Sequence, residues 1–120
     1  MAPIYDCGNC FYDKVAEERI ENFLKNPDKL RDSSLNGVTA FDDENGKRIT
    51  AVRVLDFVKM YSPESFRKVY TNVCSHLNEI EELVQGIPCT FNDIEVISDN
   101  RKRYYKETFK IRLNLLGTYC

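Results

Sequence analysis

Cys7 and Cys10, within the segment CGNC, are the first residues whose types and spacing could support chemistry. Two thiolates at this spacing can bind one zinc ion, and the glycine between them helps the backbone turn around the metal. A closed zinc site needs two further ligands, and the sequence has no second C-x-x-C pair. The remaining candidate ligands are Cys74, His76, Cys89 and Cys120.

A thiol redox role is the second chemistry open to this pair, because a thiolate just before a helix is stabilised by the helix N-terminus. The strand that precedes such a pair in thioredoxin-type sites is missing upstream of Cys7. Ordinary reduced thiols are the third interpretation, since five cysteines is an odd number and indicates no disulfide framework. We therefore expect no cofactor, with zinc at Cys7 and Cys10 as the alternative.

Nothing else in the sequence matches a known catalytic site. His76 is the only histidine, and its place opposite the apolar side of a predicted helix indicates an exposed side chain. Acidic clusters at 42–44 and 79–82 fit a solvated turn and a solvated helix face better than a metal site. There is no phosphate-binding glycine loop and no nucleophile elbow. The sequence therefore favours a protein that is not an enzyme.

The segment RKRYYKETFKIRLNLLG at 101–117 concentrates positive charge in a chain that is acidic overall. Residues 101–112 hold six lysines and arginines against Glu107 alone, whereas the whole chain carries 17 basic and 19 acidic side chains. Charge polarised in this way can steer an oppositely charged partner, or can pair with the chain's own acidic surface.

Alternation of apolar and polar residues along 103–116 predicts a strand with one dry and one wet face. The wet face and the preceding turn would gather cations around Tyr104, as a surface for an anionic or acidic partner requires. The same pattern also fits an ordinary solvated sheet face, and Glu107 falls on the dry side as an anomaly. The candidate binding residues are Arg101, Lys102, Tyr104, Lys106, Lys110 and Arg112.

The N-terminal part of the chain predicts an irregular lead-in over residues 1–8 and then a helix. Apolar residues three and four positions apart begin at Phe11, and Asn9 suits the cap before them. Pro27 disfavours helical geometry in the residue before it, so the helix should end there, with one short turn to follow.

Asn45-Gly46 predicts a hairpin with a type I′ turn between strands near 37–42 and 47–54. A short helical segment would follow Leu55. The alternative is a helix that begins at about Thr50 and aligns its apolar residues on one side.

The clearest predicted element is one long helix over 62–86, with Ser62 as its cap, Pro63 in its first position and Gly86 at its end. A strand over 89–98, a turn and the strand over 103–116 would make a second hairpin. The predicted fold class is α+β: a four-stranded antiparallel sheet of two hairpins, packed on one long helix and one or two shorter helices.

Length and composition predict a single domain over 1–120 that can bury a core, with 42% hydrophobic residues. No secretory signal and no membrane-spanning run is evident, so we expect a soluble cytoplasmic protein. The favoured function is a small non-enzymatic binding protein, a regulatory or inhibitory accessory protein that docks on another macromolecule through the basic, aromatic sheet face, with a protein as the favoured partner. The alternatives are a nucleic-acid or nucleotide binder and a small zinc- or thiol-dependent domain, and a homodimer is compatible with each.

Overall fold

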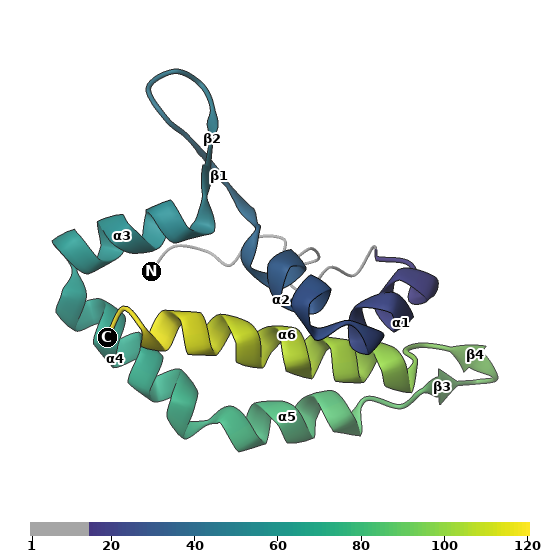
Figure 1. The fold of residues 1–120 in the computed structure, drawn as a ribbon. Coiled ribbons are helices and arrows are strands. Elements are labelled where there is room, and N and C mark those ends of the chain that lie inside the picture. The colour runs from purple at the N-terminus through teal and green to yellow at the C-terminus, as the bar shows by residue number, and fades with distance from the viewer. Residues whose placement is uncertain (1–14) are drawn as a thin grey trace.

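Helices dominate the computed structural model of the chain, which describes residues 15–120 except the side chains of residues 38–40 (Figure 1). Six helices and two separate two-stranded sheets lie within these residues, so the predicted α+β fold with a four-stranded sheet is wrong. In chain order the elements are α1 (Glu17–Lys25), α2 (Pro27–Leu35), β1 (Val38–Asp42), β2 (Arg48–Thr50), α3 (Ala51–Tyr61), α4 (Pro63–Ser75), α5 (Leu77–Gly86), β3 (Thr90–Phe91), β4 (Ile94–Glu95) and α6 (Asp99–Gly117).

The largest correction concerns residues 99–117, which form the helix α6 instead of a turn and a strand. The Ser98 hydroxyl accepts a hydrogen bond from the Arg101 backbone N–H at 3.0 Å, and Asp99 follows in the first turn, where a carboxylate favours the helix. α6 is covered by α1 and α2 on one side and by α4 and α5 on the other (Figure 1). Its apolar residues are therefore spread around the helix, and this spread resembles the two-residue period of a strand.

The main core cluster lies between α1, α2 and α6. It is made by Ile20, Leu30 and Tyr104, one from each helix, and Ile20 and Tyr104 are almost completely buried. The ring of Phe23 stacks on Tyr104 with 6.0 Å between the ring centroids, which adds an aromatic contact to the burial.

The first predicted helix ends before Pro27, as expected, but its other details differ. α1 begins at Glu17, because Ala16 has an extended backbone, and Pro27 starts a nine-residue helix instead of a single turn. The Asn26 side chain caps α2 by accepting the backbone N–H of Lys29 at 3.2 Å. The lead-in over 1–8 and the predicted start at Phe11 lie outside the described residues.

The long helix predicted over 62–86 is two helices, α4 and α5, which meet at His76. The Ser75 hydroxyl donates to the Asn72 carbonyl oxygen at 2.8 Å, and His76 Nδ1 lies 2.9 Å from the same oxygen. Side chains that compete for a backbone carbonyl weaken a helix at that point. His76 is exposed as predicted, whereas Cys74, expected in the core, is exposed as well.

α4 approaches α6 closely where Tyr70 meets Gly117. A methyl group added at position 117 would lie 2.6 Å from the Tyr70 hydroxyl oxygen, so the contact has room only for glycine unless Tyr70 shifts. A hydrogen bond with Cys74, followed by partial burial, raises the pKa of Tyr70.

The predicted hairpin around Asn45-Gly46 is present as β1 and β2. Only Gly46 of this pair has a positive φ, at 73°, so the turn is not of type I′. The Asp43 carboxylate accepts the backbone N–H groups of Lys47 and Asn45 at 3.0 and 2.9 Å, and these bonds lower the pKa of Asp43. The tip of this hairpin is polar.

The strand predicted up to residue 54 is wrong, and the alternative, a helix from about Thr50, is confirmed. β2 ends at Thr50, whose hydroxyl accepts the backbone N–H of Arg53 at 3.4 Å and caps α3. α3 packs on β2 and α4, and is separated from the start of α6 by α2 (Figure 1).

Residues 89–98, predicted as one strand, contain the short hairpin of β3 and β4, which projects beyond the end of α5 and α6 (Figure 1). Phe91 pairs with Ile94 across the hairpin. The two residues between them, Asn92 and Asp93, have φ values of 50° and 62°, the left-handed geometry of a type I′ turn. Ile97, just after the hairpin, is buried.

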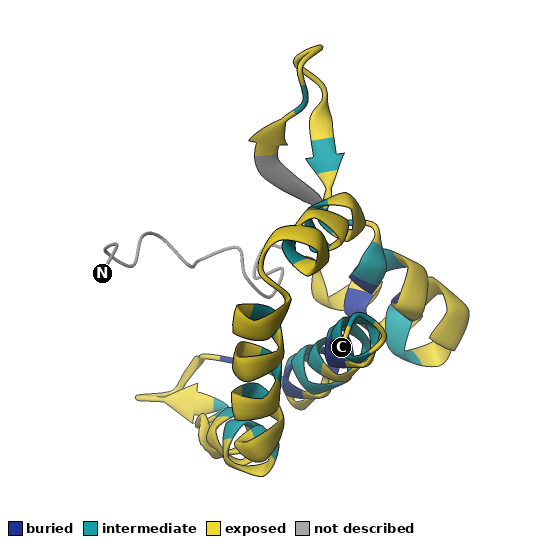
Figure 2. Cartoon of the chain, turned by 90° about the vertical axis from the view of Figure 1, so that its left-hand side faces the viewer, coloured by how far each residue is buried: buried dark blue, intermediate teal, exposed yellow. Residues whose placement is uncertain are grey.

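Most of the chain that the structure describes is exposed (Figure 2), and large apolar side chains are among the exposed residues, most of them on α3 and in residues 91–96. Within residues 15–120, five hydrophobic side chains are buried, whereas eleven large ones are at least 36% exposed. Contiguous exposed apolar groups mark interaction surfaces in soluble proteins, so these side chains are candidates for a binding site. No helix in the described part of the chain is long and apolar enough to cross a membrane.

Candidate protein-binding surfaces

The sheet face that was expected to gather the predicted binding residues does not exist in the described part of the chain, because these residues lie on α6. Towards α5, the Nζ groups of Lys102 and Lys106 donate to the backbone and side-chain oxygens of Gln85, at 3.1 and 2.9 Å. Lys110 forms an ion pair with Glu81 at 3.0 Å, which raises the pKa of Lys110. These three lysines hold α5 against α6.

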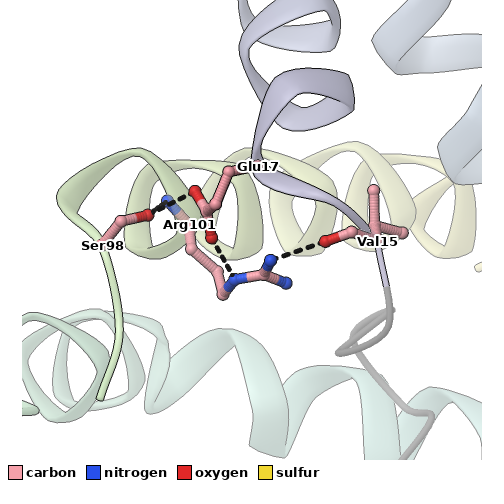
Figure 3. Close-up of polar contacts among 4 residues, drawn as sticks. All are labelled: Val15, Glu17, Ser98 and Arg101. Carbon is pink, nitrogen blue, oxygen red and sulfur yellow. Dashed lines mark hydrogen bonds and ion pairs between the residues drawn. The ribbon is translucent and has the colours of Figure 1, made fainter. Parts of the chain in front are cut away.

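Arg101 joins the start of α6 to α1 through a network of four residues (Figure 3). Its Nε lies 2.7 Å from one carboxylate oxygen of Glu17, and its Nη2 donates to the Val15 carbonyl at 2.6 Å. The Ser98 hydroxyl donates to the other Glu17 oxygen at 2.7 Å. The hydrogen bonds from Ser98 and Arg101 outweigh the effect of burial and lower the pKa of Glu17, which favours its charged form. The carboxylate thereby links α1 to Ser98, a residue 81 positions later in the chain.

Burial by itself would lower the pKa of Arg101, but hydrogen bonds with Tyr105 and Glu17 outweigh it and raise that pKa. Arg112, further along α6, donates from Nε to the Ser34 carbonyl at 3.1 Å, near the C-terminal end of α2, where a cation favours the helix. Tyr104, expected as a ring for a ligand, is 1% exposed and belongs to the core. The binding role of the six residues stays a prediction, now without the common surface that motivated it.

Cys7 and Cys10 lie outside the described residues, so zinc binding and thiol chemistry at this pair stay predictions. The cysteines within residues 15–120 are free: Cys74 and Cys120 are exposed, and Cys89 is partly buried. No group of three or more metal-ligating side chains gathers within these residues.

α3 carries the first apolar surface that the chain leaves open. Eight of its eleven residues are apolar, and its charged residues, Arg53, Asp56 and Lys59, recur at three-residue steps, yet none of its residues is buried. A helix with so many apolar residues normally buries part of them against its neighbours. Phe57 and Tyr61 stack one turn apart with 6.0 Å between ring centroids and are 50% and 72% exposed, and Met60 beside them is 71% exposed. We call these three residues the outer face of α3.

The charged residues of α3 are engaged within the chain. Arg53 lies 3.7 Å from Asp43 in an ion pair, and Lys59 lies 5.7 Å from the centroid of the Tyr119 ring. Partial burial, the charge of Asp56 and a hydrogen bond with Asp56 raise the pKa of Tyr119. The outer face therefore offers a partner mainly apolar and aromatic contacts.

The opposite side of α3 borders a groove of about 860 Å³. α6 contributes Tyr104, Arg112 and Leu115 to the groove, α1 and α2 form one wall, and Val54 and Leu55 of α3 form the other. Nine of its fifteen described lining residues are apolar. Arg112 and Arg19 supply its two charges, and no carboxylate lines it within residues 15–120. The groove is therefore apolar and electropositive.

No family model, no curated protein and no solved structure matches the chain significantly.

Sequence reasoning missed both surfaces. The apolar periodicity of 54–61 was recognised as an alternative helix, but it is equally the pattern of a helix that packs in a core. Only the positions of the neighbouring helices show that Phe57, Met60 and Tyr61 point away from the chain. The high share of apolar residues in α3, eight of eleven, is the local signal that could have identified this helix.

Proposed function

We propose that this chain is a small non-enzymatic protein that regulates or inhibits another protein by binding it through the outer face of α3. The observation that supports this function most directly is the exposure of Phe57, Met60 and Tyr61 on a helix with no buried residue. Aromatic residues and methionine are enriched at protein interfaces, and clustered exposed aromatics are typical energetic anchors.

The chemistry of the outer face defines the partner. Because the charges of α3 are engaged with Asp43 and Tyr119, recognition depends on apolar contact, as when a helix lies in a hydrophobic groove. The partner is therefore a protein with an apolar groove that accepts side chains from consecutive turns of one helix. The non-enzymatic part of the proposal rests on the sequence, which carries no catalytic constellation.

The test compares three immobilised forms of the full chain in cell lysate, followed by calorimetry with the purified partner. The first form is the wild type, and the second carries Phe57→Ser, Met60→Ser and Tyr61→Ser. The third, a matched control, carries Glu64→Ser, Lys68→Ser and Asn72→Ser at exposed positions of α4. We expect the wild type and the control to retain the same protein and the outer-face variant to bind it at least about 100-fold more weakly.

Equal retention of that protein by the outer-face variant would contradict the proposed function. Circular dichroism and thermal unfolding of all three forms separate a lost contact from a lost fold. The substituted side chains are exposed, so folding should be unaffected.

A further inference from the structure

The β3–β4 hairpin is a second apolar element that nothing in the described chain covers. Phe91 and Ile94 are 65% and 69% exposed, and Val96 is 52% exposed. Phe91 and Ile94 are directly paired, so their side chains lie on the same face of the hairpin. Val96 follows Ile94 by two residues and extends that face. Thr90 and Glu95 pair on the other face, so the hairpin has one apolar and one polar face.

The hairpin also has a charge of one sign. Residues 89–96 contain Asp93 and Glu95, both exposed, and no lysine, arginine or histidine. An apolar tip flanked by two carboxylates suits an apolar site that carries cations and lacks acids.

The groove described above has that chemistry. Its lining is mainly apolar, and among the lining residues that the structure describes Arg19 and Arg112 are the only charged ones. The Arg19 guanidinium lies 5.5 Å from the centroid of the Phe23 ring, at the α1 wall. The negative charge of the hairpin is thus complementary to the positive charge of the described lining of the groove.

The two complementary surfaces do not meet within one chain. The hairpin projects past the end of α6 where that helix begins, whereas the groove lies between α1, α2 and α3 along the part of α6 from Tyr104 to Leu116 (Figure 1). β3 and β4 pack principally on each other. A second copy of the chain can bring a hairpin to the groove, and a two-fold pair would contain this contact twice.

The other hairpin supports this assignment by contrast. The tip between β1 and β2 carries Asp43, Glu44 and Lys47, and Arg48 forms an ion pair with Asp42 at 3.3 Å. Charges of both signs at a hairpin tip discourage association between copies. The β3–β4 hairpin instead carries charge of one sign only, on Asp93 and Glu95, and exposes Phe91 and Ile94.

We propose that two copies of this chain associate by inserting the apolar tip of each β3–β4 hairpin into the electropositive groove of the other. Apolar burial of Phe91 and Ile94 supplies the affinity, and attraction between the carboxylates of Asp93 and Glu95 and the positively charged side of the groove sets the orientation. This association is independent of the proposed function, because the outer face of α3 belongs to neither the hairpin nor the groove.

The proposal is tested by measuring the mass of the full chain in solution by sedimentation. Protein concentrations up to about 1 mM are used, because association with a Kd near 1 mM is still detectable there. The wild type should form a species of two chains. A tip variant, Phe91→Ser with Ile94→Ser, and a groove variant, Val54→Asp, should each weaken association at least about 100-fold. A control on the other hairpin, Glu44→Ser with Lys47→Ser, should associate as the wild type does.

Mixing the tip variant with the groove variant gives the decisive result. The tip variant has an intact groove and the groove variant has an intact tip, so a mixture regains one of the two contacts and should form a mixed pair. If the two copies instead associated by contact between their hairpin tips, the mixture would form no such mixed pair, because the tip variant has no intact tip to contribute. The proposal is overturned by a wild type of single-chain mass, by a tip variant that associates normally, or by a mixture that stays as single chains.

Failure of the self-association test leaves the proposed function untouched, since partner capture is measured with the outer-face variant. That variant should keep the two-chain mass. Circular dichroism on each variant shows whether the helices persist. Neither site of substitution contributes to the main core cluster of Ile20, Leu30 and Tyr104.

Discussion

At the scale of single residues, Glu17 shows how a partly exposed side chain can hold two distant segments together. Its carboxylate receives hydrogen bonds from Ser98 and Arg101 and thereby joins α1 to the first turn of α6. The pKa of Glu17 is lowered in the folded chain, so folding is favoured when this carboxylate is charged.

Stability should therefore depend on the ionisation of Glu17. A group with a lowered pKa contributes stability above its unfolded pKa, about 4.3 for glutamate, and loses the contribution as the pH falls through its folded pKa. The wild type should be more stable than Glu17→Gln at pH 7, and the difference should shrink as the pH falls below about 4. Urea unfolding of both proteins from pH 3 to pH 7 measures this, and a pH-independent difference would contradict it.

The residue scale also explains the failed prediction of a basic binding face. The sequence shows that these side chains are positively charged, but not where their partners lie. Lys102, Lys106 and Lys110 interact with oxygen atoms on α5, whose position depends on the fold. Glu107 was an anomaly only because a strand was assumed, since a helix has no dry strand face for it to interrupt.

At the scale of elements, local chemistry was predictable and packing was not. Pro27 ends a helix, and Asn45-Gly46 marks a hairpin, because these residues restrict their own backbone or tolerate a special one. α6 was mistaken for a strand because neighbours on two sides spread its apolar residues. The exposed surfaces could not be predicted, since exposure of Phe57 or Phe91 depends on where other elements end.

Helix packing gives a prediction of its own at Gly117. Gly117→Ala should destabilise the chain by about 1 kcal/mol or more, because the new methyl group would crowd the Tyr70 hydroxyl. In a Tyr70→Phe background the nearest remaining ring atom is 3.3 Å away, so the cost should fall and the better helix propensity of alanine should offset it. Thermal unfolding of the wild type, the two single variants and the double variant measures the energetic coupling between positions 70 and 117. Equal effects of Gly117→Ala with tyrosine and with phenylalanine at position 70 would exclude the contact.

At the scale of the whole molecule, stability is unevenly distributed. α6 packs on four other helices, and its buried Tyr104 belongs to the main core cluster, whereas α3 packs on β2 and α4 and has no buried residue. Regions with little burial open locally at low free energy.

Native-state hydrogen exchange should reveal this difference. We expect the backbone amides of α3 and of the β3–β4 hairpin to exchange through local opening, with little dependence on urea. The central amides of α6 should exchange only by global unfolding, with the full urea dependence. Equal protection of α3 and α6 in dilute protein would contradict this distribution.

The position of α6 in the chain has a consequence for biosynthesis. α6 follows all four helices that pack on it, so a ribosome delivers residues 99–117 after α1, α2, α4 and α5. Until then Ile20 and Leu30 lack Tyr104, their aromatic neighbour in the core. The nascent chain therefore exposes the apolar faces that α6 will cover until α6 has been made, and such transient exposure favours aggregation or contact with chaperones during synthesis.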